Sequence, residues 1–385
     1  MSKKAKRENR VFLFGVIFIL AGAVTAAVLS LFNPRTEVGD ISEPEPVVAK
    51  KTSDEKALEK LSGMTLDEKI GQLLFARVPE ANIIEDLNEY HLGGYILFGR
   101  DVEGESLDSL AAKISSWQSM AKIPMFMGID EEGGIVSRLS YAGLADFSSP
   151  QDLYAEGGFG LIRKEENEKI DMLEKLGINV NFAPVADTCT NENSFIYERT
   201  FGKDAVETAE FISNIAEVYN GRKVSATLKH FPGYGNNADT HTGIAVDDRT
   251  LEDFRAADFL PFKAGVEKDV DFIMFSHNIV TNVDPFNPAS ISSEMHRILR
   301  DELNYSGLAI TDDLSMDAVA EYYHGEYPSE VQAVLAGNNM MIVSDYKTAF
   351  TNLKSALGSG IITEEKLNEL LLPVLKLKAE KGLFD

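Results

Sequence analysis

The chain has 385 residues and a formal net charge of −24, and 44% of its residues are apolar, a share typical of folded globular proteins. This composition excludes a wholly disordered chain, and the strong acidity argues against nucleic acid or an anionic membrane surface as the main partner. The single cysteine, Cys189, excludes a disulfide framework within the chain and any site built from several cysteines.

The first 52 residues differ in composition from the rest of the chain. Residues 1–10 hold five Lys or Arg and one Glu, and residues 11–32 contain no charged side chain. At a helical rise of about 1.5 Å per residue, this uncharged stretch can span a bilayer, and the basic residues before it predict a cytoplasmic N-terminus. We therefore expect a single-pass protein of the cell membrane. A cleaved signal peptide, which would release a secreted protein, is the alternative.

Four segments follow from this pattern. We expect a basic cytoplasmic segment (1–10), a transmembrane signal anchor (11–32), a tether rich in Pro and Glu (33–52) and one extracytoplasmic domain (53–385).

Residues 53–385 alternate between short apolar runs and longer amphipathic segments. Thr65 and Glu68 have the spacing of a capping box and predict a helix that includes residues 70–74. Strands are predicted at 94–98, 124–129, 180–184, 224–229, 272–277, 308–311 and 340–343. Helices are predicted at 107–120, 162–176, 205–220, 251–266 and 346–357. Seven or eight such units predict a (β/α)₈ TIM-type barrel. A doubly wound open sheet is the alternative, although no G-x-G-x-x-G motif follows the first strands.

Ionisable side chains lie at, or just after, the ends of five of the predicted strands. They are Asp130, Asp187, Lys229 with His230, His277, and Asp312 with Asp313. The C-terminal ends of barrel strands converge on one face, where active sites are built. An Asp after a strand is often the N-cap of the next helix, and taken singly we expect this of Asp187 and Asp313. The five together indicate an enzyme without indicating which one.

Asp239 and His241 stand two residues apart in a segment rich in Gly and Asn. Side chains two apart in an extended segment share a face, so the carboxylate could orient the imidazole as a general acid/base. A turn-forming Asp beside a surface His is the alternative. Neither H-x-H nor H-E-x-x-H occurs, and the six His residues are dispersed, so we expect no metal and no cofactor.

From Met64 to its end, the chain resembles the barrel domain of family 3 glycoside hydrolases, and more narrowly their β-N-acetylglucosaminidase (β-hexosaminidase) branch. The motifs that carry the resemblance are GIDEEGG (128–134), NFAPVAD (181–187), RTFG (199–202), KHFPG (229–233) and ITDDLSM (310–316). Glu131 stands where this family usually has Gln.

The resemblance implies retaining hydrolysis through a covalent glycosyl-enzyme. Asp312 would be the nucleophile, and His241, oriented by Asp239, would be the acid/base. The implied sugar-binding residues are Asp130, Arg138, Arg199, Lys229 and His230. A retaining enzyme needs an ionised carboxylate near the anomeric carbon, and we expect Lys229 and Arg199 to lie beside Asp312 and keep it ionised.

These observations predict an exported, membrane-tethered glycosidase that removes β-linked N-acetylglucosamine, with peptidoglycan fragments as the source. They leave the oligomeric state open. Within the same fold, another β-glycosidase or a phosphorylase is possible. A metal-dependent barrel hydrolase that uses Asp130, His230, His277 and Asp312 is a second class, and a non-catalytic wall-binding protein is a third.

Overall fold

The computed structural model describes residues 51–235, 243 and 245–384. The predicted cytoplasmic segment, the predicted transmembrane span and most of the predicted tether lie outside these residues, as do Asp239 and His241. Within the described part of the chain, no helix combines the length and the apolar character needed to cross a bilayer.

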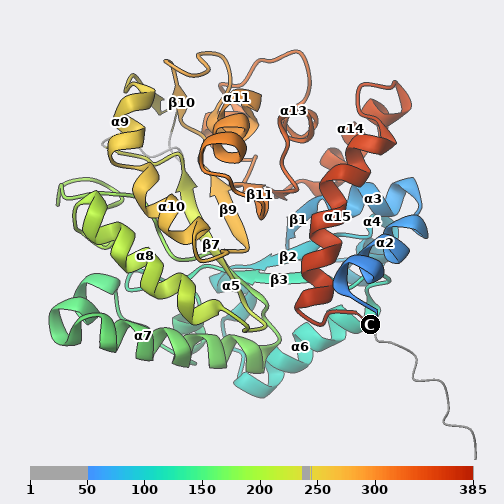
Figure 1. The fold of residues 1–385 in the computed structure, drawn as a ribbon. Helices are drawn as coiled ribbons and strands as arrows, with labels where there is room; N and C mark the ends of the chain where they lie inside the picture. Colours follow the sequence, from blue (N-terminus) through green and yellow to red (C-terminus); the bar gives the residue numbers. More distant parts are fainter. Residues whose placement is uncertain (1–50, 236–242, 244, 385) are drawn as a thin grey trace, which may run out of the picture. The chain divides into compact units, whose positions relative to one another are not determined.

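Eight parallel strands close into a barrel, as the alternation of strands and helices predicted (Figure 1). The order around the barrel is β1, β12, β11, β9, β7, β6, β3 and β2. The bounds are β1 (Leu74–Arg77), β2 (Gly94–Leu97), β3 (Phe126–Ile129), β6 (Val180–Asn181), β7 (Ser225–Phe231), β9 (Phe272–Phe275), β11 (Leu308–Thr311) and β12 (Met340–Val343). Because the sheet closes on itself, the doubly wound alternative is excluded.

Two small sheets lie in segments that follow barrel strands. Strands β4 (Glu131–Gly133) and β5 (Val136–Ser137) form an antiparallel pair directly after β3, and β8 (Val246–Asp247) pairs in parallel with β10 (Ile279–Val280). The first pair carries residues of the site described below.

The sequence predicted seven of the eight barrel strands and missed β1. The prediction continued the first helix through Leu74, but α3 (Leu66–Gln72) ends before it and β1 begins there. A continuous apolar run does not distinguish a buried helix from a buried strand, which is why the boundary was hidden. The predicted capping box is confirmed, because Thr65 N donates to Glu68 Oε2 (2.7 Å) and Glu68 N donates to Thr65 Oγ1 (3.3 Å).

Helices cover the outside of the barrel (Figure 1). Besides α3, they are α2 (Ser53–Ser62), α4 (Ile83–Tyr90), α5 (Gly99–Val102), α6 (Leu107–Met120), α7 (Pro150–Leu176), α8 (Ala205–Tyr219), α9 (Leu251–Ala256), α10 (Phe259–Val266), α11 (Ser293–Arg297), α12 (Asp317–Ala320), α13 (Ser329–Ala336), α14 (Tyr346–Gly358) and α15 (Glu364–Glu380). The helix predicted at 251–266 is divided into α9 and α10. Helix α2 (blue) packs beside α15 (red), so the first and last described helices are neighbours.

Large apolar side chains fill the barrel interior. Phe75, Phe126 and Phe182 are fully buried in one cluster. Gly128 leaves room for two of these rings, because a Cβ there would lie 2.6 Å from the Phe182 ring and 2.8 Å from the Phe75 ring. The interior is therefore a packed core, and the space for a ligand lies above it, at the strand ends.

Lys378 of α15 closes the N-terminal end of the barrel. Its Nζ donates to Gln72 Oε1 (2.6 Å), Gly93 O (2.9 Å) and Pro124 O (2.7 Å), just before β1, β2 and β3. The side chain is fully buried and these three partners are neutral, so burial lowers the pKa of Lys378 well below its ordinary value. One side chain thus ties three strand starts to the last helix.

Candidate active site

A pocket of about 220 Å³ lies at the C-terminal ends of the barrel strands. Six of the eight site residues predicted from the sequence line it: Asp130, Arg138, Arg199, Lys229, His230 and Asp312. The other two, Asp239 and His241, are outside the described residues. The pocket also contains Arg77, Phe98, Glu132 and Asp313, which the sequence prediction did not assign to it.

Glu132 is the centre of the charged network in this pocket. Lys229 Nζ lies 2.6 Å from Glu132 Oε1 and 2.7 Å from Asp130 Oδ1. Arg199 donates two hydrogen bonds to the carboxylate of Glu132, from Nε to Oε2 (3.0 Å) and from Nη2 to Oε1 (2.8 Å). Such a bidentate pair fixes orientation as well as charge. Glu132 therefore holds the cationic groups of β7 and of the segment after β6 in one arrangement.

The charge state of Glu132 follows from its surroundings. Burial by itself would raise the pKa of Glu132, but the charges of Arg199 and Lys229 outweigh burial and hold the pKa well below its ordinary value. The pKa of Arg199 is raised, because the attraction of Glu132 exceeds the cost of burial. Glu132 and Arg199 are therefore both ionised at neutral pH.

Lys229 and Arg199 share the pocket with Asp312, as predicted, but their ion pairs are made with other carboxylates. Arg199 pairs with Glu132, and Lys229 pairs with Glu132 and Asp130. Their effect on the ionisation of Asp312 remains a prediction. The sequence prediction gave no role to Glu132, although it lies in the 128–134 motif. The run of three adjacent carboxylates that begins at Asp130 was a signal for such a role.

Asp187, which does not line the pocket, orients His230. Its Oδ2 accepts hydrogen bonds from His230 Nδ1 (2.7 Å) and from the His230 backbone N–H (3.0 Å), while its Oδ1 accepts from Tyr234 N (2.7 Å). Arg199 Nη2 lies 3.3 Å from His230 Nε2 and can only donate, so Nε2 accepts and Nδ1 carries the hydrogen. The prediction that Asp187 is a helix N-cap is therefore wrong.

Asp312 follows β11 and is fixed through its backbone. Its N–H donates to Phe275 O of β9 (3.0 Å), and its Oδ1 accepts from Asp313 N (2.8 Å). Asp313 was predicted to be an N-cap, and this is also wrong, since its Oδ1 accepts from Ser315 and its Oδ2 accepts from Ser344 Oγ (2.7 Å). The hydrogen bonds of Asp313 instead stabilise the turn that directly follows Asp312.

Glu131 holds the hairpin that leads to Arg138. Its carboxylate accepts hydrogen bonds from Ser137 Oγ, from Arg138 N (2.9 Å) and from Leu139 N (3.0 Å). The side chain is completely buried, and burial raises the pKa of Glu131 despite these donors. The residue therefore positions the backbone of Arg138 and does not face the pocket.

The geometry gives no support to the metal-dependent alternative. His277 has both ring nitrogens engaged by the protein, with Ser290 Oγ at 2.7 Å from Nδ1 and Asp313 O at 3.0 Å from Nε2. Across residues 51–235, 243 and 245–384, no three His, Cys, Asp or Glu side chains are grouped so that they could hold a metal ion.

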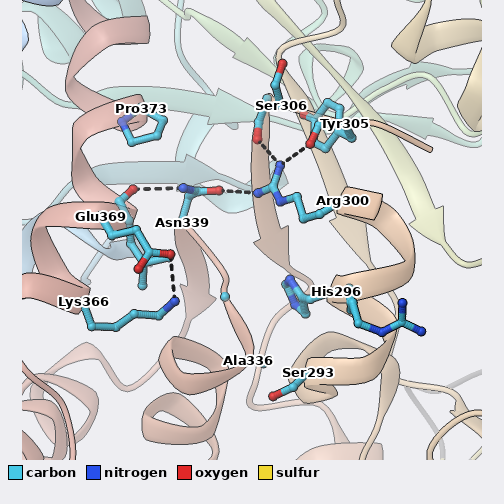
Figure 2. Close-up of a pocket in the computed structure, with 14 residues that line it drawn as sticks. Ser293, His296, Arg300, Tyr305, Ser306, Ala336, Asn339, Lys366, Glu369 and Pro373 are labelled. Atoms are coloured by element: carbon cyan, nitrogen blue, oxygen red, sulfur yellow. Dashed lines mark hydrogen bonds and ion pairs between the residues drawn. The ribbon is translucent and has the colours of Figure 1, made fainter. Parts of the chain in front are cut away.

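A second cavity, of about 460 Å³, lies at the opposite ends of the strands, before β11 and β12 (Figure 2). Arg300 donates there to Tyr305 O (3.0 Å), Gly307 O (2.7 Å) and Asn339 Oδ1 (2.9 Å). None of the predicted site residues lines this cavity. Arg300 thus braces two strand starts, and the candidate active site is the pocket at the C-terminal face.

Comparison with known proteins identifies the family of the chain that forms this pocket. Residues 65–377 match the model of the glycosyl hydrolase family 3 N terminal domain. The chain belongs to glycosyl hydrolase family 3. The resemblance predicted from the five motifs is thereby confirmed, and the family 3 chain is a glycoside hydrolase, which overturns the non-catalytic alternative.

Two relatives that are both named beta-hexosaminidase match more than two thirds of this chain. A protein named beta-hexosaminidase from Nitrosomonas eutropha is 31% identical over 274 residues, which are 69% of this chain and 77% of that protein. Another protein named beta-hexosaminidase, from Stenotrophomonas maltophilia, is 33% identical over 282 residues, which are 71% of this chain and 82% of that protein.

Solved structures agree with this family 3 assignment. The structure of a family 3 beta-N-acetylglucosaminidase from Paenibacillus sp. is 31% identical, superposes with a TM-score of 0.78 and covers 83% of this chain. This chain covers 63% of that structure, just under two thirds.

Proposed function

We propose that this family 3 chain is a retaining β-N-acetylhexosaminidase that removes terminal β-linked N-acetylglucosamine. The observation that carries the proposal is the position of Asp312, at the C-terminal end of β11, in one pocket with Asp130, Lys229 and His230. The names of the relatives support N-acetylglucosamine as the sugar that is released. We also propose peptidoglycan fragments as the source, which rests on the predicted export.

The proposed reaction has two displacements. The Asp312 carboxylate attacks the anomeric carbon, the bond to the leaving group breaks, and the leaving oxygen takes a proton from His241, oriented by Asp239. Water then attacks the anomeric carbon of the glycosyl-enzyme and gives a proton to His241, and the bond to Asp312 breaks, which restores both groups. The roles of Asp239 and His241 rest on the family resemblance.

The remaining pocket residues can bind the sugar. Asp130 accepts hydrogen bonds from hydroxyl groups, and Arg138 donates them. Lys229 pairs with Asp130 and Glu132, and His230 pairs with Asp187, so their orientation is set before substrate arrives.

Hydrolysis of aryl β-glycosides by the purified chain tests the proposal. We expect cleavage of the N-acetylglucosaminide, a much slower reaction with the glucoside, and loss of turnover in Asp312→Ala. An activated fluoro-sugar should label Asp312, and labelling of another residue would refute the nucleophile. Rates that require phosphate and yield a sugar 1-phosphate would establish the phosphorylase alternative instead.

We also propose that residues 11–32 anchor the protein and that the barrel is extracytoplasmic. The uncharged stretch and the basic residues before it support this topology. Added protease should degrade the barrel in intact spheroplasts, and a barrel that is degraded only after lysis would contradict export.

A further inference from the structure

The cavity before β11 and β12 contains an arginine, Arg300, whose charge has no carboxylate partner (Figure 2). All three hydrogen bonds that Arg300 donates go to neutral oxygens. Among the described residues, no Asp or Glu forms an ion pair with it. Burial lowers the pKa of Arg300, because the cation loses water without gaining a counter-charge. An anion bound in the cavity would supply that counter-charge.

The other charged groups that line this cavity are already compensated. Lys366 Nζ lies 3.0 Å from Glu369 Oε1. Arg297 Nη2 lies 2.6 Å from Glu294 Oε1. His296 is neutral at pH 7, because burial lowers its pKa from 6.5 to about 3. One uncompensated positive charge therefore remains among the described residues of the lining, and it matches a ligand with a single negative charge.

Arg300 also keeps hydrogen-bond donors for a ligand. Its contacts with the protein use both N–H groups of Nη1 and one of those on Nη2. The Nε–H has no partner among the described residues, and it is not closed to solvent. The centre of the Tyr305 ring lies 5.2 Å from the guanidinium carbon, and such a contact does not occupy the in-plane donors. The guanidinium can therefore donate hydrogen bonds to a bound acid.

The backbone that carries Arg300 is unusual. Residues Ile298–Glu302, directly after α11, form a π-helical turn, and no other π-helical segment occurs in the described part of the chain. Such turns are rare and are found frequently at functional sites. The uncommon conformation of this turn points to a role for Arg300 beyond support of the strand starts.

The rest of the wall is largely apolar. It includes Ala336, Leu370, Pro373 and the Tyr305 ring. The cavity volume of about 460 Å³ lies within the range of about 300–1,000 Å³ that is typical of small-molecule sites. The cavity shares no lining residue with the candidate active site, and the packed barrel interior lies between them. It therefore suits a ligand that has an apolar body and one charged end.

We propose that this cavity is a second ligand site and that it binds a small organic acid, with the carboxylate on Arg300 and the apolar part against Leu370 and Pro373. The carboxylate compensates the buried charge and accepts hydrogen bonds from the free guanidinium donors, which are strong when both groups are charged. The inference does not depend on which sugar the enzyme releases, because the two sites have no residue in common.

Calorimetric titration of the full chain with benzoate and with benzamide tests the role of charge. The two probes share the same ring and nearly the same shape, and only benzoate is charged. We expect benzoate to bind at least about 10-fold more tightly, because hydrogen bonds between charged groups are the stronger ones. Inorganic phosphate should bind more weakly than benzoate, since it has no apolar part.

Ser306 offers a matched pair of variants. It is exposed and lines the cavity, and the residues on either side of it accept hydrogen bonds from Arg300 through their carbonyl oxygens. Ser306→Glu would add a carboxylate that competes with the ligand for Arg300, so benzoate binding should weaken by about 10-fold or more. Ser306→Gln has the same size without the charge and should keep the wild-type affinity.

Arg300→Met should abolish the preference for benzoate over benzamide. Because this change also removes three hydrogen bonds to strand starts, thermal unfolding has to show that the variant is folded. The two Ser306 variants keep Arg300 and its bonds, so they decide the question if Arg300→Met does not fold.

Four results would overturn the inference. They are a wild type that does not bind benzoate, equal affinities for benzoate and benzamide, tighter binding of phosphate than of benzoate, and benzoate binding that Ser306→Glu leaves unchanged. Competitive inhibition of aryl N-acetylglucosaminide cleavage at the measured Kd of benzoate would place the acid in the pocket at the C-terminal face, and this would also contradict it.

Discussion

The carboxylate of Asp187, after β6, lies 2.7 Å from His230 Nδ1 in β7 and accepts two backbone N–H groups as well. Both side chains are buried, so this contact, and not solvent, sets which ring nitrogen of His230 faces the pocket. Because Asp187 does not line the pocket, we describe it as a positioning residue. Its effect on the reaction passes through His230.

We therefore expect Asp187→Asn to lower kcat/KM for the aryl N-acetylglucosaminide by about 10²-fold, because a misplaced binding group has an effect of that order. Asn replaces one carboxylate oxygen by an NH₂ group, and this group cannot accept a hydrogen bond from the N–H donors of His230 and Tyr234. Steady-state kinetics with a thermal unfolding control would measure this. Asp171→Asn, at an exposed ion pair with Arg222, should have wild-type kinetics. A folded Asp187→Asn with wild-type kcat/KM would show that His230 needs no such support.

Glu132→Gln should destabilise the fold by about 3–5 kcal/mol, because it leaves the buried Lys229 and the partly buried Arg199 without the carboxylate that pairs with both. The lowered pKa of Glu132 means that its contribution is present above the unfolded-state pKa and is lost as the pH falls through the folded-state pKa. Urea unfolding at pH 7 measures the loss. Glu217→Gln, at an exposed pair with Arg163, should change the free energy of unfolding very little. Equal losses in the two variants would contradict the central role of Glu132.

Asp258 should make stability fall as the pH rises from about 4 to about 7. Its Oδ2 pairs with Arg249 (2.7 Å), but its Oδ1 is buried without a hydrogen-bond partner, and burial raises the pKa of Asp258 from 3.8 to about 6. The folded state thus retains a proton that the unfolded chain has lost, so the contribution to stability is present below pH 4 and is lost as the pH rises through 6.

The measurement is the free energy of unfolding of the wild type minus that of Asp258→Asn, at several pH values. This difference should fall by about 2–3 kcal/mol over that pH range, at 1.36 kcal/mol per pKa unit. Because the other carboxylates are common to both proteins, their pH dependence cancels. A difference that is flat with pH would mean that Asp258 titrates normally in the folded state.

Lys378→Met should cost about 3 kcal/mol of stability or more, because it removes three hydrogen bonds and leaves the buried Gln72 Oε1 without its donor, while Gly93 O keeps only the Phe126 N–H. Lys376→Met on the same helix is the control, since Lys376 is 45% exposed and pairs only with Asp54 among the described contacts. Chemical denaturation compares the two. A similar small effect in both would show that Lys378 is not needed to close the barrel.

The fold was predictable where the residue pattern is local. Continuous apolar runs identified seven barrel strands, and a hydroxyl and a Glu at capping-box spacing located the start of α3. The failure at β1 has a physical reason, because the run from Leu73 to Ala76 is apolar and buried whichever structure it adopts. The same failure concealed Arg77, which becomes a pocket residue only when Leu74–Arg77 is recognised as a strand.

The amino-acid sequence by itself determined the alternation of strands and helices, the family, and six pocket residues. Asp130, Lys229, His230 and Asp312 were found at strand ends, whereas Arg138 and Arg199 came from the family motifs, and each of these signals depends on neighbours along the chain. Tertiary structure decided which charges meet. Glu132, and not Asp312, pairs with Lys229 and Arg199, and Asp187 holds His230 where the sequence predicted a helix cap. Ion pairs and hydrogen bonds form over a few ångströms between residues that lie 31 to 99 positions apart in these networks, so only closure of the barrel brings the partners together.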